Sequence, residues 1–535
     1  MSMIPPRISG GDALVRALVA HGTELVFGIP GTHNLGVYRA LAEQGVKHVT
    51  SRHEQGAGFA ADGYARVTGK PGICLTTSGP AVLNAMTAVT QSYSDSVPVL
   101  LISPGMPLHH PGRGNGTLHE VRHQSAALEA AIGYSIRVHS VAEIPLAVAQ
   151  AFAHMTSGRP RPAHLEIPLD LIDTVDRVSD VPPVLVAHPP ADAVTVAAAV
   201  RRLNSAERPG FIVGGGAKGA AEELTTLAER LGAPVVSTAN GKGTFSERHP
   251  LSIGAGLHLK AVADFVAECD VVVATGTELA STDLWHGPLK FAGDLIRIDV
   301  DPAQMITNAL PDYRLVGDAQ ATVAALNQRL GNGKPGEEAA QRAERWQRLF
   351  RKHARAQGAA WLPLVETVQD VLAPGAIIAG DSAMACYYGT LSNLLLERPA
   401  SFLYPTGFGS LGYGLPAAIG AKLGSPDRQV VALHGDGGVM FTLPELTTAA
   451  QERLALPVIV CDNGGYGEIR REMVERGDPV HGVNLPGVDF AKVAKALNCH
   501  GVTVSTQDKL ATALRKAFTA DRPTVIHVVG DLAGS

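Results

Sequence analysis

The strongest constraint on the fold is a pattern that recurs three times along the 535-residue chain. Short runs rich in valine and isoleucine alternate with amphipathic stretches rich in alanine, leucine and glutamate, which is typical of parallel strands joined by helical crossovers. A chain of this length is too long for one hydrophobic core. We therefore predict an α/β protein of three doubly wound domains with mainly parallel sheets.

Breaks in composition indicate where these domains end. The segment 182–190 holds two Pro-Pro pairs and reads as a linker. Further along, Gly331-Asn-Gly-Lys-Pro-Gly336 opens a polar helical connector rich in glutamate, glutamine and arginine. We predict an N-terminal domain over residues 1–180, a central Rossmann-like domain over 191–330 and a C-terminal domain over 360–535.

Composition argues against several classes of partner. The net charge is −5 and there is no Lys/Arg block, so we expect neither a nucleic-acid partner nor a membrane surface. No apolar run reaches membrane-spanning length without charged or turn residues, and the start lacks the apolar core of a signal peptide. The five cysteines are scattered and form no CxxC pair, so we expect a reducing, cytoplasmic compartment.

A glycine-rich turn in the third block carries the strongest chemical signal. The predicted strand 429–433 leads into His434-Gly-Asp-Gly-Gly438, whose backbone N–H groups can approach a phosphate closely. Asp436 would repel phosphate unless a cation lies between them, and Mg²⁺ prefers carboxylate, carbonyl and phosphate oxygens. The next predicted strand, 457–461, ends beside Asn463 and so supplies a second ligand. The alternative is a tight turn with a structural asparagine.

This GDG motif followed by an asparagine resembles the diphosphate-binding motif of the thiamine diphosphate-dependent enzymes. The resemblance implies that Asp436, Asn463 and the Gly465 carbonyl hold Mg²⁺. The family usually has two asparagines where this chain has Asp462-Asn463, and the second is the usual ligand. The residues that this motif would place against the cofactor are Asp436, Gly437, Gly438, Asn463, Gly465 and Tyr466.

In the first block, the run Arg52-His-Glu-Gln-Gly-Ala-Gly-Phe-Ala-Ala-Asp-Gly-Tyr-Ala-Arg66 follows a predicted strand and opens a helix. Glu54 would lie in the first helical turn, where a purely structural role is to complement the helix dipole. The run closely resembles the family segment whose glutamate hydrogen-bonds the cofactor's aminopyrimidine ring and promotes ionisation of thiazolium C2. The resemblance implies that Glu54 is the catalytic glutamate.

Three further loops resemble cofactor-binding segments of the same family. The Thr77–Ala81 loop with Asn84 is similar to the GPG-x-x-N loop, although Ala81 replaces its last glycine. The segment 407–418 is similar to the one whose large apolar residue bends the cofactor, and 380–383 to a loop beside the diphosphate. The cofactor contacts that these loops imply are Gly79, Asn84, Ser382, Gly409 and Leu411.

The substrate side is predicted from histidines and one carboxylate. His119 stands where acetolactate synthases have a glutamine facing the reacting carbon, which favours protonation chemistry. His110 belongs to a His-His pair that resembles that of pyruvate decarboxylases; the alternative is a solvated loop histidine. Glu468, in the helix after Asn463, would meet a cationic substrate tail, or else belongs to an exposed helix of mixed charge.

The central block contains a GxGxxG turn at Gly214–Gly219, which alone is a weak signal. No acidic residue closes the next predicted strand, 234–238, so a nicotinamide dehydrogenase is a poor alternative. The block resembles the central domain that carries FAD in acetolactate synthase. Residues 275–285 depart from the arginine-containing FAD segment of those enzymes, so FAD is not expected.

The resemblance covers nearly the whole chain and implies a thiamine diphosphate- and Mg²⁺-dependent, non-oxidative decarboxylase of a small-molecule 2-oxo acid. Residues 118–120, 277–285 and 404–413 are most similar to the decarboxylases of 5-guanidino-2-oxopentanoate. The alternatives are an acetolactate synthase-type carboligase that joins two 2-oxo acids, a pyruvate oxidase-type flavoenzyme, and a nonenzymatic nucleotide-binding scaffold. The resemblance also implies a homodimer as the minimum active unit and a homotetramer as the assembly.

Overall fold

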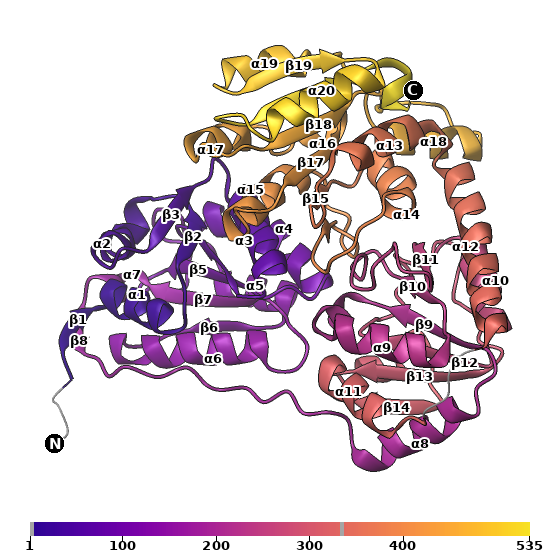
Figure 1. Ribbon diagram of the computed structural model, residues 1–535. Helices are drawn as coiled ribbons and strands as arrows, with labels where there is room; N and C mark the ends of the chain where they lie inside the picture. Colours follow the sequence, from indigo (N-terminus) through magenta and orange to yellow (C-terminus); the bar gives the residue numbers. More distant parts are fainter. Residues whose placement is uncertain (1–4, 332–335, 535) are drawn as a thin grey trace.

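The computed structural model describes residues 5–331 and 336–534, and it contains three six-stranded parallel sheets with helices on their faces (Figure 1). The prediction of three α/β domains with parallel sheets is confirmed. Four residues of the predicted connector, 332–335, lie outside the described residues. A small antiparallel pair, β1 (Arg7–Ser9) with β8 (Val175–Arg177), joins the start of the first domain to its end.

In the first and third sheets, the second strand along the chain pairs on one side of the first strand and the third strand pairs on its other side. In the central sheet, the second and third strands both lie on one side of the first strand, and the fourth strand pairs on its other side. In such sheets, ligands bind beyond the carboxyl ends of the strands at the point where the strand order reverses. In spatial order, the first sheet is β3 (Lys47–Thr50), β2 (Leu25–Gly28), β4 (Gly72–Leu75), β5 (Val99–Gly105), β7 (Ala163–Pro168) and β6 (Ser135–Arg137). The central sheet is β11 (Ser252–Ala255), β10 (Val235–Ser237), β9 (Pro209–Val213), β12 (Val271–Thr275), β13 (Asp294–Asp299) and β14 (Tyr313–Val316). The third sheet is β16 (Phe402–Leu403), β15 (Ile377–Gly380), β17 (Val430–Gly435), β18 (Pro457–Cys461), β20 (Thr524–Val528) and β19 (His500–Val504). The switch points lie between β2 and β4, between β9 and β12, and between β15 and β17.

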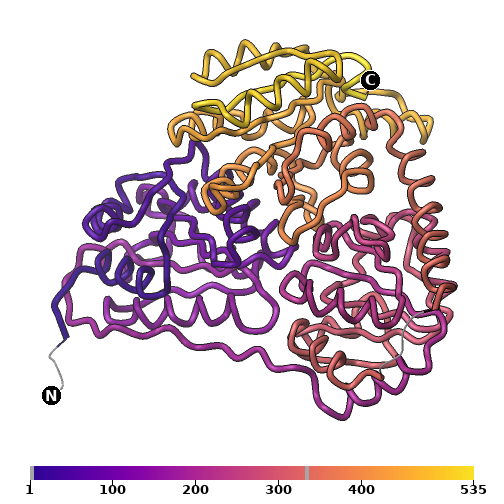
Figure 2. Tube along the Cα trace, in the orientation of Figure 1, coloured from indigo at the N-terminus to yellow at the C-terminus, as the bar shows by residue number. Residues whose placement is uncertain are grey.

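Two connections of different kinds link the sheets. The proline-rich segment 182–190 forms no helix or strand and runs along the lower edge of the molecule to α8 (Ala193–Asn204) (Figure 2). The second connection is α12 (Glu337–Gln357), a 21-residue helix that runs from the central sheet towards the third one. Trp346 and Phe350 on its buried face pack into the core of the central domain.

The first and third domains are joined by two closely packed helices, α3 (Glu54–Thr68) and α15 (Gly414–Gly424). A Cβ atom on Gly63 would lie 2.1 Å from the Ala417 carbonyl oxygen, and one on Gly420 would lie 1.8 Å from that of Ala60. Only glycine permits backbones to approach so closely. The small residues of the 52–66 run therefore fix the position of the helix that begins at Glu54.

A buried charge network reinforces this contact and reaches the central domain. Arg66 Nε lies 2.6 Å from Asp62 Oδ1, and Arg66 Nη2 lies 2.8 Å from Asp95 Oδ2. The Tyr413 hydroxyl donates to Asp62 at 2.6 Å, and Arg66 also donates to Asn240 at 3.1 Å. These residues belong to all three domains, so the network fixes their relative positions.

Within residues 5–331 and 336–534, no helix is both long enough and apolar enough to cross a bilayer.

Candidate active site

One residue of the candidate site follows each of four neighbouring strands of the first sheet. His33 follows β2 within the short helix η1 (Thr32–Asn34), and Glu54 follows β3. Gly79 follows β4, and His119 lies in the long loop after β5. All four strands are parallel, so their carboxyl ends meet at one edge of the sheet. We call His33, Glu54, Gly79, Asn84 and His119 the N-terminal group.

Glu54 is the first residue of α3, as the sequence predicted. The His53 ring accepts a hydrogen bond from the Gln55 N–H at 3.1 Å and caps the helix. One Glu54 carboxylate oxygen, Oε2, accepts a hydrogen bond from the Asn84 amide at 2.9 Å. Asn84 lies on α4 (Pro80–Ser94), so the structure brings together two residues that were predicted from separate motifs.

Position 79 requires glycine because of its backbone conformation and the closeness of His119. Its φ is +64°, a conformation that favours glycine, and a Cβ atom there would lie 2.3 Å from the His119 carbonyl oxygen. The Gly79 N–H donates to Gln124 Oε1 at 2.9 Å, and Pro80 then starts α4. The Gly79 loop and the His119 loop are thus packed directly against each other.

His119 lies against a second histidine that the sequence analysis did not identify. The rings of His119 and His33 are 5.0 Å apart and meet edge to face. His119 Nδ1 is buried without a hydrogen-bond partner, whereas His33 Nδ1 lies 2.6 Å from Ser78 Oγ. Burial lowers the pKa of His33, and the adjacent His119 lowers it further. The signal that could have identified His33 is its position shortly after the apolar run Leu25–Gly28, which forms β2 of the parallel sheet.

His110 is placed differently from His119. Its Nε2 lies 3.4 Å from both Glu120 Oε1 and Thr117 Oγ1, and its Nδ1 accepts from the Gly112 N–H at 3.2 Å. Glu120 in turn accepts from the backbone N–H groups of residues 115–117. Both ring nitrogens of His110 are therefore engaged within the loop. The loop borders a cavity of about 1140 Å³ that is also lined by Arg113, Arg122 and Arg137.

The third sheet supplies a second set of predicted residues around Asp436. Asp436 opens the short helix α16 (Asp436–Val439) directly after β17, and Asn463 follows the adjacent strand β18. The Asn463 amide oxygen lies 3.2 Å from Asp436 Oδ1 and 3.0 Å from the Gly465 carbonyl oxygen. Burial raises the pKa of Asp436, and the nearby Asp462 carboxylate adds to this effect.

Three converging oxygens repel one another unless a cation lies between them, whereas without a cation a flip of the amide lets its nitrogen donate to both neighbours. In an octahedron with bonds of ~2.1 Å, neighbouring ligand oxygens are about 3.0 Å apart, which suits Mg²⁺. Among residues 5–331 and 336–534 no group of three His, Cys, Asp or Glu side chains is suited to a metal. A metal at this position therefore depends on amide and carbonyl oxygens, and the residues present fit that requirement.

The glycines of the motif allow close approach of bulky residues. A Cβ atom on Gly437 would lie 2.8 Å from the Tyr466 ring. One on Gly438 would lie 2.4 Å from Asp381 Oδ2 and 3.6 Å from the Leu411 side chain. The structure therefore places Tyr466 and Leu411 on the GDG turn, where the sequence predicted cofactor contacts.

Asp381 is a positioning residue that the sequence analysis passed over. Its fully buried carboxylate accepts from the Gly412 N–H at 3.0 Å and the Tyr413 N–H at 3.1 Å. It also lies 2.9 Å from His434 Nδ1. It thereby ties the loop of Gly409 and Leu411 to the strand before Asp436. Half-buried Ser382 follows it beyond β15, and Gly409 has a φ of +66° and is exposed. We use the name C-terminal group for the residues around the GDG turn: Ser382, Gly409, Leu411, Asp436, Gly437, Gly438, Asn463, Gly465 and Tyr466.

Glu468 extends this group on α18 (Gly467–Arg476). Its Oε1 accepts from the Tyr388 hydroxyl at 2.8 Å and from Arg471, while its Oε2 is buried and receives no hydrogen bond. The Tyr387, Tyr388 and Trp285 rings lie edge to face beside it, with centroids 4.6 to 6.2 Å apart. Burial, followed by the Glu468 carboxylate, raises the pKa of both tyrosines.

The two groups are separate within one chain. Among the described residues, no hydrogen bond or ion pair joins the N-terminal group to the C-terminal group. Contacts between the two domains lie close to both groups. Glu445, which follows the GDG turn, accepts from the N–H groups of Arg52 and His53 at 2.9 and 3.0 Å. Gln91, on the same helix as Asn84, accepts from the Ser410 N–H at 3.3 Å. The described contacts thus include no direct bond between the two groups within one chain.

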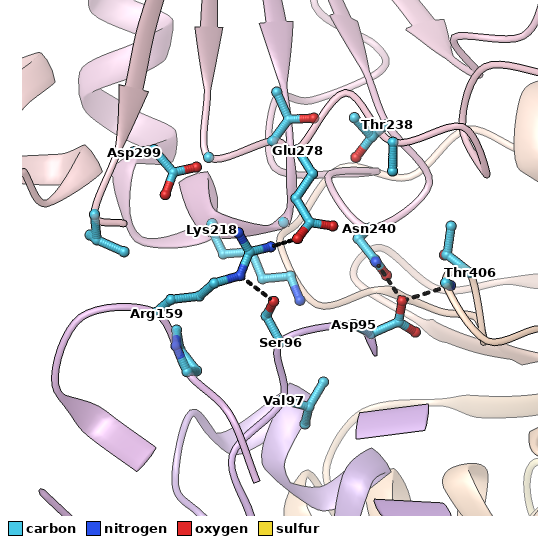
Figure 3. A pocket seen from close by; sticks show the side chains of 18 of the residues that line it. Asp95, Ser96, Val97, Arg159, Lys218, Thr238, Asn240, Glu278, Asp299 and Thr406 are labelled. Atoms are coloured by element: carbon cyan, nitrogen blue, oxygen red, sulfur yellow. Dashed lines mark hydrogen bonds and ion pairs between the residues drawn. The ribbon is translucent and has the colours of Figure 1, made fainter. Parts of the chain in front are cut away.

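A second cavity, of about 280 Å³, lies at the switch point of the central sheet and borders all three domains (Figure 3). Arg159 crosses it, bonded to Ser96 at 2.9 Å and paired with Glu278 at 2.5 Å. Lys218 points into the cavity and makes no hydrogen bond or ion pair with the described residues. Burial and the nearby Arg66 lower the pKa of Lys218 to about 8.

The fold and the two groups of residues define a cofactor-dependent enzyme of three α/β domains. The chain belongs to the thiamine pyrophosphate enzyme family. Residues 8–127 match its N-terminal thiamine pyrophosphate-binding domain, 196–326 its central domain and 383–528 its C-terminal thiamine pyrophosphate-binding domain. The predicted family membership is thus confirmed, and the protein is a thiamine diphosphate-dependent lyase or carboligase.

Relatives of both reaction types cover almost the whole chain. It is 40% identical over 530 residues to the probable 2-ketoarginine decarboxylase AruI of Pseudomonas aeruginosa, covering 97% of this chain and 94% of that protein. It is 34% identical over 553 residues to an acetolactate synthase large subunit of Parasynechococcus marenigrum (98% and 88% covered). It is 32% identical over 546 residues to the acetolactate synthase isozyme 2 large subunit of Escherichia coli (97% and 95% covered).

Proposed function

We propose that the protein is a thiamine diphosphate- and Mg²⁺-dependent decarboxylase that converts a 2-oxo acid with a cationic tail, 5-guanidino-2-oxopentanoate, into an aldehyde and CO₂. His119 is the residue that supports decarboxylation over carboligation. Its Nδ1 is buried without a hydrogen-bond partner, and it lies at the same edge of the sheet as Glu54. An imidazole can give a proton to carbon near neutral pH, whereas the glutamine of acetolactate synthases cannot. The choice of 5-guanidino-2-oxopentanoate as substrate is supported by the name of the relative from Pseudomonas aeruginosa, a probable 2-ketoarginine decarboxylase.

The residues divide the work between the two halves of the cofactor. Thiamine diphosphate, when bound, supplies the electron sink that makes loss of CO₂ feasible. We assign the metal to Asp436, Asn463 and the Gly465 carbonyl, and the aminopyrimidine side to Glu54, Asn84 and Gly79. Leu411 would support the cofactor from the GDG turn. Further contacts in this proposal come from Ser382, Gly409, Gly437, Gly438 and Tyr466.

We infer that two chains complete the site, because no hydrogen bond or ion pair among the described residues joins the group of Glu54 to that of Asp436 within one chain. Apolar side chains beside each half are exposed: Leu83 is 44% exposed next to Asn84, and Met440 and Phe441 are 47% and 50% exposed after the GDG turn. Exposed apolar clusters of this kind mark protein interfaces. A homodimer is thus the minimum active unit, and we propose a homotetramer as the assembly.

We infer that Glu468 receives the guanidinium tail. Its buried Oε2, which accepts no hydrogen bond, offers a charged acceptor. The adjacent Tyr387 ring offers a face for a cation, whereas Arg471 already lies over the Tyr388 ring, 4.8 Å from its centroid. Arg471 already neutralises part of this charge, so the tail would bind beside it. Glu472 is the matched control, since it is exposed on the same helix.

Two further expectations accompany this proposal. We expect no bound flavin, because residues 275–285 depart from the arginine-containing FAD segment of acetolactate synthases. We also propose that the protein acts in the cytoplasm, since all five cysteines are buried free thiols.

The experiment that tests the function is CO₂ release by the purified protein with thiamine diphosphate and Mg²⁺ across a series of 2-oxo acids. Preference for the guanidino acid over 2-oxohexanoate, with an aldehyde product, supports the proposal. Glu468→Gln should raise KM for the guanidino acid and leave 2-oxohexanoate unchanged, whereas Glu472→Gln should alter neither. Acetolactate formed from pyruvate would instead place the protein among the synthases.

A further inference from the structure

We propose that His33 is a second proton-transfer residue that acts on the same substrate as His119. This inference rests on the proposed decarboxylase function. Two imidazoles that follow different strands meet at one edge of the first sheet, and no sequence motif predicted this contact.

The position of His33 is fixed by its neighbours. It lies in η1, immediately beyond β2, which is a strand at the switch point of the first sheet. Nδ1 lies 2.6 Å from Ser78 Oγ, and Nε2 makes no hydrogen bond or ion pair with the described residues. If Ser78 donates its hydroxyl hydrogen to Nδ1, then Nε2 carries the ring hydrogen and is free to deliver it.

The pair is electrostatically coupled. The ring centroids of His33 and His119 are 5.0 Å apart, so a charge on one imidazole disfavours a charge on the other. Among the described residues, burial lowers the pKa of His33 most, and the charge of His119 lowers it further. The backbone of His119 has a φ of +63°, an unfavourable value for histidine, which indicates that its place beside Gly79 and His33 is imposed by packing.

The chemistry requires two separate proton-transfer groups. The substrate oxygen gains a proton when its carbon is attacked and loses it when the aldehyde C=O forms. The carbon gains a proton after its bond to the carboxylate breaks and CO₂ leaves. We assign to His33 Nε2 the proton that the substrate oxygen gains and later returns. We assign to His119 the proton that the carbon gains, and His119 then takes a new proton from water. The balance is one proton consumed from solvent for each CO₂ released.

The test uses His33→Gln, His33→Ala and the control His109→Gln, since the His109 side chain is 83% exposed in the neighbouring loop. Loss of a general acid-base group lowers kcat by about 10²-fold or more. We expect this loss for both His33 variants, with thiamine diphosphate affinity and C2 hydrogen exchange retained because Glu54 is untouched. Added imidazole should restore activity to His33→Ala and not to His33→Gln. A kcat within twofold of the native value in His33→Gln would overturn the proposal.

A second readout separates this proposal from the proposed function. In the cofactor-free protein, NMR titration of His33 should show a pKa that rises in His119→Gln, because the neighbouring charge has been removed. An unchanged pKa would refute the coupling of the pair. Absence of CO₂ release by the native protein would overturn the proposed function instead, and the titration would still decide whether the two imidazoles are coupled.

Discussion

Removing the carboxylate of Asp62 is the most revealing test of how the domains are held together. Asp62 is fully buried and accepts hydrogen bonds from Arg66 Nε at 2.6 Å, Ser92 Oγ at 2.8 Å and the Tyr413 hydroxyl at 2.6 Å. Asp62→Ala leaves all three donors without this acceptor. The Arg66 side chain is only 2% exposed, so its charge cannot recover full hydration.

Breaking a buried ion pair by removing one partner costs about 3–5 kcal/mol. Each hydroxyl that loses its acceptor adds roughly 1 kcal/mol. Asp95 still neutralises Arg66 at 2.8 Å, which offsets part of this cost. We therefore expect Asp62→Ala to destabilise the protein by about 4 kcal/mol, and we expect weaker thiamine diphosphate binding because Tyr413 closes the loop that holds Leu411.

The assay is urea unfolding followed by fluorescence, with the midpoint of the first transition as the measure because a three-domain chain need not unfold in one step. The control is Asp180→Ala, which breaks the surface pair with Arg16, whose side chains are 67% and 35% exposed. That pair should contribute less than about 1 kcal/mol. A midpoint for Asp62→Ala that shifts no further than that of Asp180→Ala would refute the reasoning.

Three other perturbations test the site and the first domain. Glu54→Gln should still bind thiamine diphosphate but lose C2 hydrogen exchange and turnover, and normal turnover would remove Glu54 from the mechanism. Asp436→Ala, or chelation of Mg²⁺, should abolish metal-dependent cofactor binding in calorimetry; unaltered binding would contradict the metal assignment. His164 is buried between the hydroxyls of Ser103 and Ser135, and burial lowers its pKa to about 3. Unfolding therefore takes up a proton below about pH 6.5, and stability should fall by up to about 1.4 kcal/mol per pH unit towards pH 3. His164→Gln should show a weaker decline in the urea midpoint between about pH 7 and pH 5, and an equal decline would show that other groups cause it.

The fold was predictable because its signals are local. The predicted strand 457–461 coincides with β18, and the predicted strand 429–433 falls within β17 apart from its first residue, since apolar runs bounded by turn residues mark buried parallel strands. The glycine turn predicted at His434–Gly438 also forms a short helix of its own, α16, which precedes α17 (Glu445–Gln451). Helix ends depend on caps and neighbours that periodicity does not encode.

The parts that escaped prediction depend on contacts between distant residues. Tyr413 and Asp62 are 351 positions apart, and no pattern within either segment announces that they meet. His33 belongs to no motif and acquires its place only when β2 and β5 lie in one sheet and bring the His119 loop over it. The π-helix at Ala385–Thr390, which sets Tyr387 and Tyr388 beside Glu468, likewise has no simple sequence signal.

The most direct test of a site shared between two chains is complementation. Glu54→Gln and Asp436→Ala are each expected to release no CO₂ from 5-guanidino-2-oxopentanoate with thiamine diphosphate and Mg²⁺. After the two variants are mixed, denatured and refolded together, half of the dimers would be mixed, and each mixed dimer would hold one intact site. Activity should return to about a quarter of the native value. Mixtures that stay inactive, although native protein treated in the same way recovers, would contradict a site built from Glu54 of one chain and Asp436 of another.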